Sequence, residues 1–145
     1  MDKEEYEKAL PYLEIEIKKD RSFLKAWAYY QIGYCYGQLG NYNKAIEAFK
    51  QAIRIIPDYT MAHYALGFAY TELGFYKDAI DAYKQAIRID PYDTYVHYRL
   101  GLSYFKLGFY KEAIEAYIQA IHIDPDYTMA HYALGLMYLI TGDRN

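Results

Sequence analysis

The sequence predicts an all-α protein, an α-solenoid in which antiparallel helix pairs stack on one another. The first observation is a verbatim repeat: PDYTMAHYALG stands at residues 57–67 and again at 125–135, with a looser copy at 91–101. The prolines that open these three copies are therefore 34 residues apart. A fixed period of this size indicates one supersecondary unit stacked on its own copies, not a single closed core. The second observation is that each period holds two apolar patterns of helical spacing, separated by glycine.

The period divides the chain into a leading segment, three full units and a partial unit. The expected ranges are 1–25 for an N-terminal capping helix or degenerate repeat, 26–59, 60–93 and 94–127 for the full units, and 128–145 for the first helix of a fourth unit acting as the C-terminal cap.

The leading segment is less regular than the units. We interpret residues 2–19 mainly as the second helix of an upstream, degenerate unit. Pro11 conflicts with an unbroken helix and should kink it or begin a second short helix. The alternating charges of LEIEIKKDR also leave a strand open as an alternative.

Glycine and proline mark the expected helix ends within the units. Gly40, Gly74 and Gly108 follow leucine at the end of each first helix, where a left-handed residue is least costly for glycine. Pro57, Pro91 and Pro125 should stop each second helix. Expected N-caps of the helices that follow are drawn from Asp58, Asp93 and Asp126 or the nearby Thr60, Thr94 and Thr128. Glycines inside the first helices, at positions 33, 67, 101 and 135, suggest a close approach to the paired helix.

The spacing of large and small residues resembles the tetratricopeptide repeat over residues 26–142. In the second unit the matching residues are His63, Leu66, Gly67, Tyr70, Ala79, Tyr83, Ala86 and Pro91. One departure is the family's usual tryptophan, which is replaced by Tyr29, His63, His97 and His131. The resemblance implies a right-handed superhelix whose first helices line a concave groove.

The resemblance also implies which side chains face that groove. Carried over by position, the principal contact residues are Trp27, Tyr30, Tyr34, Met61, Tyr64, Phe68, Tyr95, Tyr98, Leu102, Met129, Tyr132 and Leu136. Lesser positions on the same face are Gly37, Gln38, Thr71, Glu72, Phe105, Lys106, Leu139 and Ile140. Tyr30, Tyr64, Tyr98 and Tyr132 should form a ladder, one per unit. Such an aromatic surface suits a helix or an extended apolar peptide of a partner protein. Because no cationic residue stands at the principal positions, we expect no clamp for a partner's terminal carboxylate.

Other function classes find little support. The net charge of −3, with acidic and basic residues interspersed, argues against a nucleic-acid partner. No apolar stretch is long enough for membrane insertion. A charged N-terminus without a secretory signal, and Cys35 as the only cysteine, favour a cytoplasmic protein with a buried thiol. His63, His97 and His131 are spaced too widely for a metal site. No catalytic constellation appears, so we expect neither cofactor nor enzyme activity.

The alternative function is a self-assembling scaffold that oligomerises through groove and terminal-helix contacts. Residues 128–141 carry Leu134, Leu136, Met137, Leu139 and Ile140 with no following helix in the sequence to cover them. Terminal units of a solenoid normally need a polar outer face. Either the chain belongs to a longer array, or a second copy covers this surface and makes a homo-oligomer.

Overall fold

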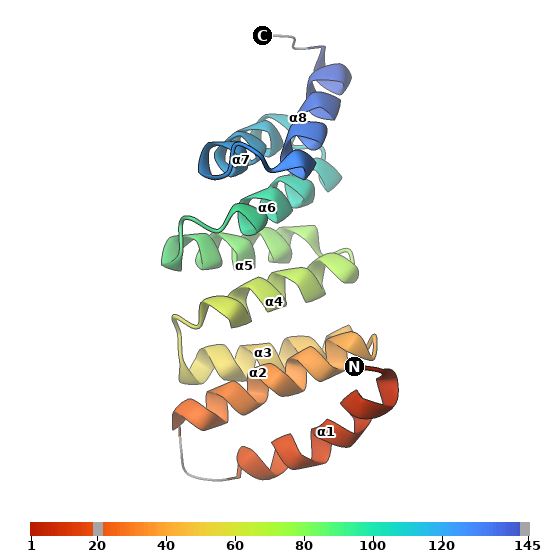
Figure 1. Ribbon diagram of the computed structural model, residues 1–145, viewed down its shortest axis with the longest axis vertical. Coiled ribbons are helices and arrows are strands. Elements are labelled where there is room, and N and C mark those ends of the chain that lie inside the picture. The colour runs from red at the N-terminus through yellow and green to blue at the C-terminus, as the bar shows by residue number, and fades with distance from the viewer. Residues whose placement is uncertain (19–21, 143–145) are drawn as a thin grey trace. The chain divides into compact units, whose positions relative to one another are not determined.

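The computed structural model describes residues 1–18 and 22–142, and all regular structure in these residues is helical. The chain divides into two compact units, Met1–Phe75 and Tyr76–Asn145. The first contains α1 (Lys3–Glu16), α2 (Ser22–Gln38), α3 (Tyr42–Ile55) and α4 (Thr60–Glu72), and the second contains α5 (Tyr76–Ile89), α6 (Thr94–Lys106), α7 (Tyr110–Ile123) and α8 (Thr128–Thr141) (Figure 1). In each unit, helices that are consecutive in the chain pack side by side, as the repeat predicts.

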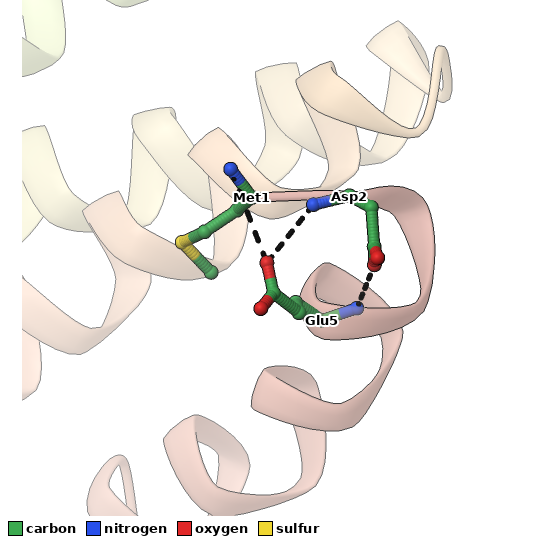
Figure 2. Close-up of polar contacts among 3 residues, drawn as sticks. All are labelled: Met1, Asp2 and Glu5. Atoms are coloured by element: carbon green, nitrogen blue, oxygen red, sulfur yellow. Dashed lines mark hydrogen bonds and ion pairs between the residues drawn. The ribbon is translucent and has the colours of Figure 1, made fainter.

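Helix α1 begins with a capping box. The Asp2 carboxylate accepts a hydrogen bond from the Glu5 backbone N–H at 3.0 Å, and the Glu5 carboxylate accepts one from the Asp2 backbone N–H at 2.9 Å (Figure 2). The N-terminal ammonium of Met1 lies 3.9 Å from the same Glu5 carboxylate. This reciprocal cap satisfies two backbone donors that a helix start leaves unpaired.

The leading segment forms a helix, as its main interpretation expected, and two of the alternatives left open for it are wrong. Helix α1 runs through Pro11 as one element, so no second short helix begins there. The strand alternative is wrong for the described part of LEIEIKKDR, because the helix continues to Glu16. In addition, α2 begins at Ser22, ahead of the expected unit boundary at Ala26. The rest of that motif, residues 19–21, lies outside the described residues.

Glycine ends the first helices as predicted. Gly40, Gly74 and Gly108 have φ angles of 79°, 78° and 79°, and Gly142 adopts the same left-handed conformation after α8. The residue after each of the first three glycines donates its N–H to a carbonyl five residues back, as Asn41 does to Tyr36 at 2.8 Å. These bonds satisfy carbonyls that the helix end would otherwise leave unpaired.

Aspartate caps only one of the expected helix starts. The Asp93 carboxylate accepts from the backbone N–H groups of Tyr95 and Val96, whereas the N-caps of α4 and α8 are Tyr59 and Tyr127, without side-chain cap hydrogen bonds. The cause is residue order. Proline is followed by Tyr-Asp-Thr before α6 but by Asp-Tyr-Thr before α4 and α8, which moves the aspartate one position too far from the helix.

Small residues place the helices of each pair in close contact. A Cβ built on Gly33 would lie 2.5 Å from the Phe49 ring, and one built on Gly101 would lie 2.5 Å from the Tyr117 ring. The alanines one turn before and after each ring, Ala45 and Ala52 or Ala113 and Ala120, are fully buried. The predicted close approach of paired helices is therefore confirmed at Gly33 and Gly101.

Candidate functional site

A pocket of about 350 Å³ lies among α2, α3 and α4 in the first unit. Its lining residues are mostly aromatic or small: Tyr30, Tyr34, Gly37, Gln38, Tyr42, Phe49, Tyr64, Ala65, Phe68 and Ala69. We call this hollow the α2–α4 pocket. Of the predicted contact residues, Tyr30, Tyr34, Tyr64 and Phe68 are among its walls.

The repeat explains why these side chains meet. Tyr30 and Tyr34 are one turn apart on α2, and Tyr64 and Phe68 occupy the same repeat positions on α4, so both pairs project from the same face of equivalent helices. Phe49 of α3 also lines the pocket, and its ring centroid lies 5.8 Å from that of Tyr30. Phe49 is 4% exposed and thus belongs to both the core and the pocket.

None of the described side chains that line the pocket is charged. Burial raises the pKa of Tyr30 above its ordinary value, and the nearby phenols of Tyr59 and Tyr34 raise it further. Burial also raises the pKa of Tyr42, with a smaller contribution from the Glu72 carboxylate. These phenols are therefore neutral near pH 7. They offer hydroxyl donors and acceptors in a lining that otherwise has the Gln38 amide and apolar groups.

Trp27 and Met61, two further predicted contact residues in this unit, lie outside the α2–α4 pocket. Trp27 is 42% exposed and lines a separate hollow of about 330 Å³ with residues of α1, among them Tyr12 and Leu13. Met61 is 57% exposed. Tyr34 lines both hollows and links the two surfaces.

A larger hollow in the first unit has a different character. It measures about 760 Å³ and is lined by residues of α1, α2 and α3 together with Ile17 and Lys18. Its charged side chains are of both signs: Glu14, Lys18, Lys44, Glu47, Lys50 and Arg54. Such a surface fits a solvated face of the helices better than an apolar peptide site. The sequence-based reasoning did not single it out.

In the second compact unit, Tyr76–Asn145, some predicted contact residues of α6 are at the surface and others are in the core. Tyr95 is 38% exposed and stacks on Tyr98 with ring centroids 6.2 Å apart. Tyr98 is only 9% exposed and packs against the rings of Tyr117 and Tyr127. Leu102 is half-buried against the same cluster. Tyr98 is therefore a core residue, and the tyrosine ladder is not uniformly open.

The predicted contact residues of α8 are exposed. Met129 is 51%, Tyr132 72% and Leu136 40% exposed. Tyr132 holds the repeat position of Tyr98, so the same residue type is buried on one helix and open on another.

The three repeat-position histidines have a structural role that the sequence reasoning missed. The Nε2 atoms of His63, His97 and His131 lie 2.8, 2.9 and 2.6 Å from the carbonyl oxygens of Pro57, Pro91 and Pro125. Because a carbonyl only accepts, each Nε2 carries the proton and donates it. The signal available in the sequence is a histidine six residues after each of the three repeat prolines, Pro57, Pro91 and Pro125. Among the described residues, no group of three or more His, Cys, Asp or Glu side chains is placed to hold a metal ion.

Two further properties bear on the kind of site. Cys35 is 4% exposed, as expected for a buried thiol, and burial raises its pKa and so disfavours the reactive thiolate. Within the described residues, no helix is both long and apolar enough to span a bilayer.

Comparisons with known proteins bear on the family. Sequence profiles described as TPR repeat match residues 69–108 and 103–142, and one described as tetratricopeptide repeat matches residues 26–59. No curated protein matches the chain by sequence.

Solved structures resemble the chain over nearly its whole length. A crystal structure of MamA is 30% identical, with a TM-score of 0.89 over 96% of this chain and 80% of that one. MamA from Desulfovibrio magneticus RS-1 is 28% identical, with a TM-score of 0.87 over 95% and 77%. YrrB, described as a TPR protein with an unusual peptide-binding site, is 26% identical, with a TM-score of 0.84 over 98% and 72%. By its sequence profiles and its fold, the chain belongs to the tetratricopeptide repeat (TPR) family.

Proposed function

We propose that this chain binds a peptide or helix of a partner protein, anchoring one or two apolar side chains in the α2–α4 pocket. The TPR fold is that of a protein-interaction scaffold, and its modules are typically non-catalytic. The observation that carries the finer proposal is the shared pocket of Tyr30, Tyr34, Tyr64 and Phe68. A cytoplasmic location, expected from the sequence, is part of the same proposal.

The pocket's chemistry supports a particular kind of ligand. Aromatic walls give large contact area for little loss of side-chain entropy. Because the described lining contains no lysine or arginine to pair with a terminal carboxylate, the ligand should be held by internal apolar residues. The likeness to YrrB, a TPR protein with a peptide-binding site, supports this class of ligand.

The expected affinity is modest. A fully buried large apolar side chain contributes about 1.5–3 kcal/mol, and association costs roughly 4–15 kcal/mol. One or two anchors contribute about 2–6 kcal/mol before this cost is subtracted, so binding through the pocket alone should be no tighter than micromolar.

Selection of peptides from a random library against the full chain tests the proposal. Selected peptides should share a large apolar residue without a requirement for a free C-terminus. Phe68→Ala should weaken their binding at least tenfold in fluorescence anisotropy, with unchanged helicity by circular dichroism. The matched control is Tyr92→Ala, since Tyr92 is 79% exposed and lies outside the pocket. Equal binding by the Phe68→Ala variant would remove the pocket from consideration.

A second candidate function is self-association, which α8 favours. Tyr132, Leu136, Leu139 and Ile140 are all exposed on this helix. Three of these four side chains are aliphatic and would ordinarily be buried. Large apolar surfaces of this kind mark interaction sites in soluble proteins.

A further inference from the structure

The glycine at one repeat position is covered in two helix pairs and bare on α8. An aromatic ring from the second helix of the pair lies against Gly33 and against Gly101, where an added Cβ would be 2.5 Å from the ring. A Cβ added at Gly135 would meet nothing within 4 Å. Helix α8 thus presents the surface that α2 and α6 use to bind a partner helix, without such a helix.

Neighbouring side chains on the same stripe of α8 are also uncovered. Tyr132 is 72% exposed, against 9% for its equivalent Tyr98, and Leu139 is 76% exposed. Together with Thr128, which is exposed as well, they form a stripe at helical spacing. We call Thr128, Tyr132, Gly135 and Leu139 the Gly135 face.

The α6–α7 pair shows what kind of helix covers such a face. Tyr117 of α7 lies on Gly101, and the buried Ala113 and Ala120 stand four residues before it and three residues after it. In an antiparallel pair this register sets Ala120 opposite Tyr98, a small residue opposite a large one. The covering helix therefore needs a small residue, an aromatic and a small residue at spacings of four and three.

Helix α8 itself meets this requirement. Thr128, Tyr132 and Gly135 have the same spacing of small, aromatic and small residues as Ala113, Tyr117 and Ala120. If Tyr132 of one copy lies on Gly135 of a second copy in antiparallel register, Gly135 of the first copy lies opposite Tyr132 of the second. The contact is thus self-complementary under a two-fold rotation axis, as an isologous dimer requires.

Charge does not oppose this pairing. The α8 sequence, TMAHYALGLMYLIT, contains no lysine, arginine, aspartate or glutamate. A two-fold axis brings each residue close to copies of its neighbours, so a charged stripe would repel itself. His131 is engaged with the Pro125 carbonyl at 2.6 Å.

We propose that two copies of this chain associate through an antiparallel α8–α8 contact, in which Tyr132 of each copy packs on Gly135 of the other. The inference rests on the second candidate function, self-association, and does not depend on the α2–α4 pocket. Because a single pair of helices is small beside a standard protein interface, the dimer should be weak.

Sedimentation equilibrium of the full chain, at protein concentrations from about 1 μM to 1 mM, tests the proposal. This range is chosen because a small interface should give a dissociation constant that falls within it. We expect a monomer–dimer equilibrium that Gly135→Ala weakens at least tenfold, because the new Cβ would occupy the ring's place. The same substitution meets no atom within the protomer, so the melting temperature of the dilute monomer should stay the same or rise. Ile118→Ala is the control, since Ile118 is 42% exposed on α7 and should leave the dimer unchanged.

Disulfide trapping tests the register. In a Cys35→Ser background, a mixture of Tyr132→Cys and Gly135→Cys chains should cross-link to each other faster than either chain cross-links to itself, because a disulfide needs Cβ atoms about 3.5–4.5 Å apart. A chain that stays monomeric to 1 mM would refute self-association as well as this contact. A dimer that is indifferent to Gly135→Ala, or that cross-links without preference for the mixed pair, would refute the α8 contact alone. It would point to another partner surface, while peptide binding to the α2–α4 pocket would be unaffected.

Discussion

Two glycines of α2 offer a test of the ring-on-glycine packing. Gly33 faces Phe49, whose Cε1, Cδ1 and Cζ atoms would lie 2.5, 2.6 and 3.0 Å from an added Cβ. Gly37, one turn later, would place its Cβ in open space. Alanine substitution at the two positions therefore makes the same chemical change in the same helix, with packing as the main difference.

The magnitude follows from two opposing effects. Alanine is favoured over glycine inside a helix by about 1 kcal/mol, so Gly37→Ala should stabilise the chain by up to that amount. At Gly33 the same gain is opposed by overpacking, which typically costs 1–3 kcal/mol. The Phe49 ring cannot swing aside cheaply, since it is 4% exposed and packs against Tyr30. We expect Gly33→Ala to be less stable than Gly37→Ala by about 1–3 kcal/mol.

Urea and thermal unfolding, followed by far-ultraviolet circular dichroism, measure this difference. Melting temperatures should differ by roughly 2–4 °C for each kcal/mol in a chain of this size. Both substitutions report on the same helix, so their comparison does not require the whole solenoid to unfold in one step. If the two variants shift equally in the stabilising direction, the contact between Gly33 and Phe49 does not set the packing of α2 on α3.

Two further predictions concern the histidines and the buried tyrosines. His97→Ala should destabilise the chain by about 1–3 kcal/mol, because it leaves the Pro91 carbonyl without the hydrogen-bond donor that the mostly buried His97 supplies. His131→Ala, at an exposed position, should lower the free energy of unfolding by less in the same urea titration. Equal losses in the two variants would contradict this reasoning. Burial holds the pKa of Tyr117 well above its ordinary value, so the folded chain keeps this proton at pH values where the unfolded chain loses it. Stability should be full below pH about 10 and fall above it, and a Tyr117→Phe variant whose alkaline unfolding is as steep as that of the parent would exclude this cause.

The helical architecture could be predicted because its determinants are local. The left-handed glycines at 40, 74 and 108 end helices through backbone freedom alone, and each was predicted from its place after leucine. Pro11 was expected to kink the helix or to begin a second short helix, and the second alternative is wrong because α1 continues through it as one element. The cost of a proline inside a helix can be offset by its neighbours, and α1 carries a capping box at its start. Asp58 and Asp126 were expected among caps, but a shift of one residue removes the geometry.

The candidate site was predictable in part. The resemblance to the tetratricopeptide repeat implied that Tyr30, Tyr34, Tyr64 and Phe68 lie on one face, and these four side chains line one pocket. Repeat position did not separate Tyr98 from Tyr132, which carry the same residue at the same place. Their burial depends on whether a second helix follows and covers them, and this is a property of packing and not of the residue itself.

The sequence by itself determined the period, the helix ends and the small-to-large spacing that lets paired helices approach, because these depend on backbone conformation and residue size within one repeat. The tertiary structure was needed to show which individual side chains and glycines at equivalent positions are buried and which are exposed. The Gly101 site is filled by Tyr117 and the Gly135 site is bare, although the two helices have closely similar sequences. The physical reason is that the burial of a residue depends on the helix packed against it: the same glycine is part of the core where an aromatic ring lies against it, and is exposed where none does.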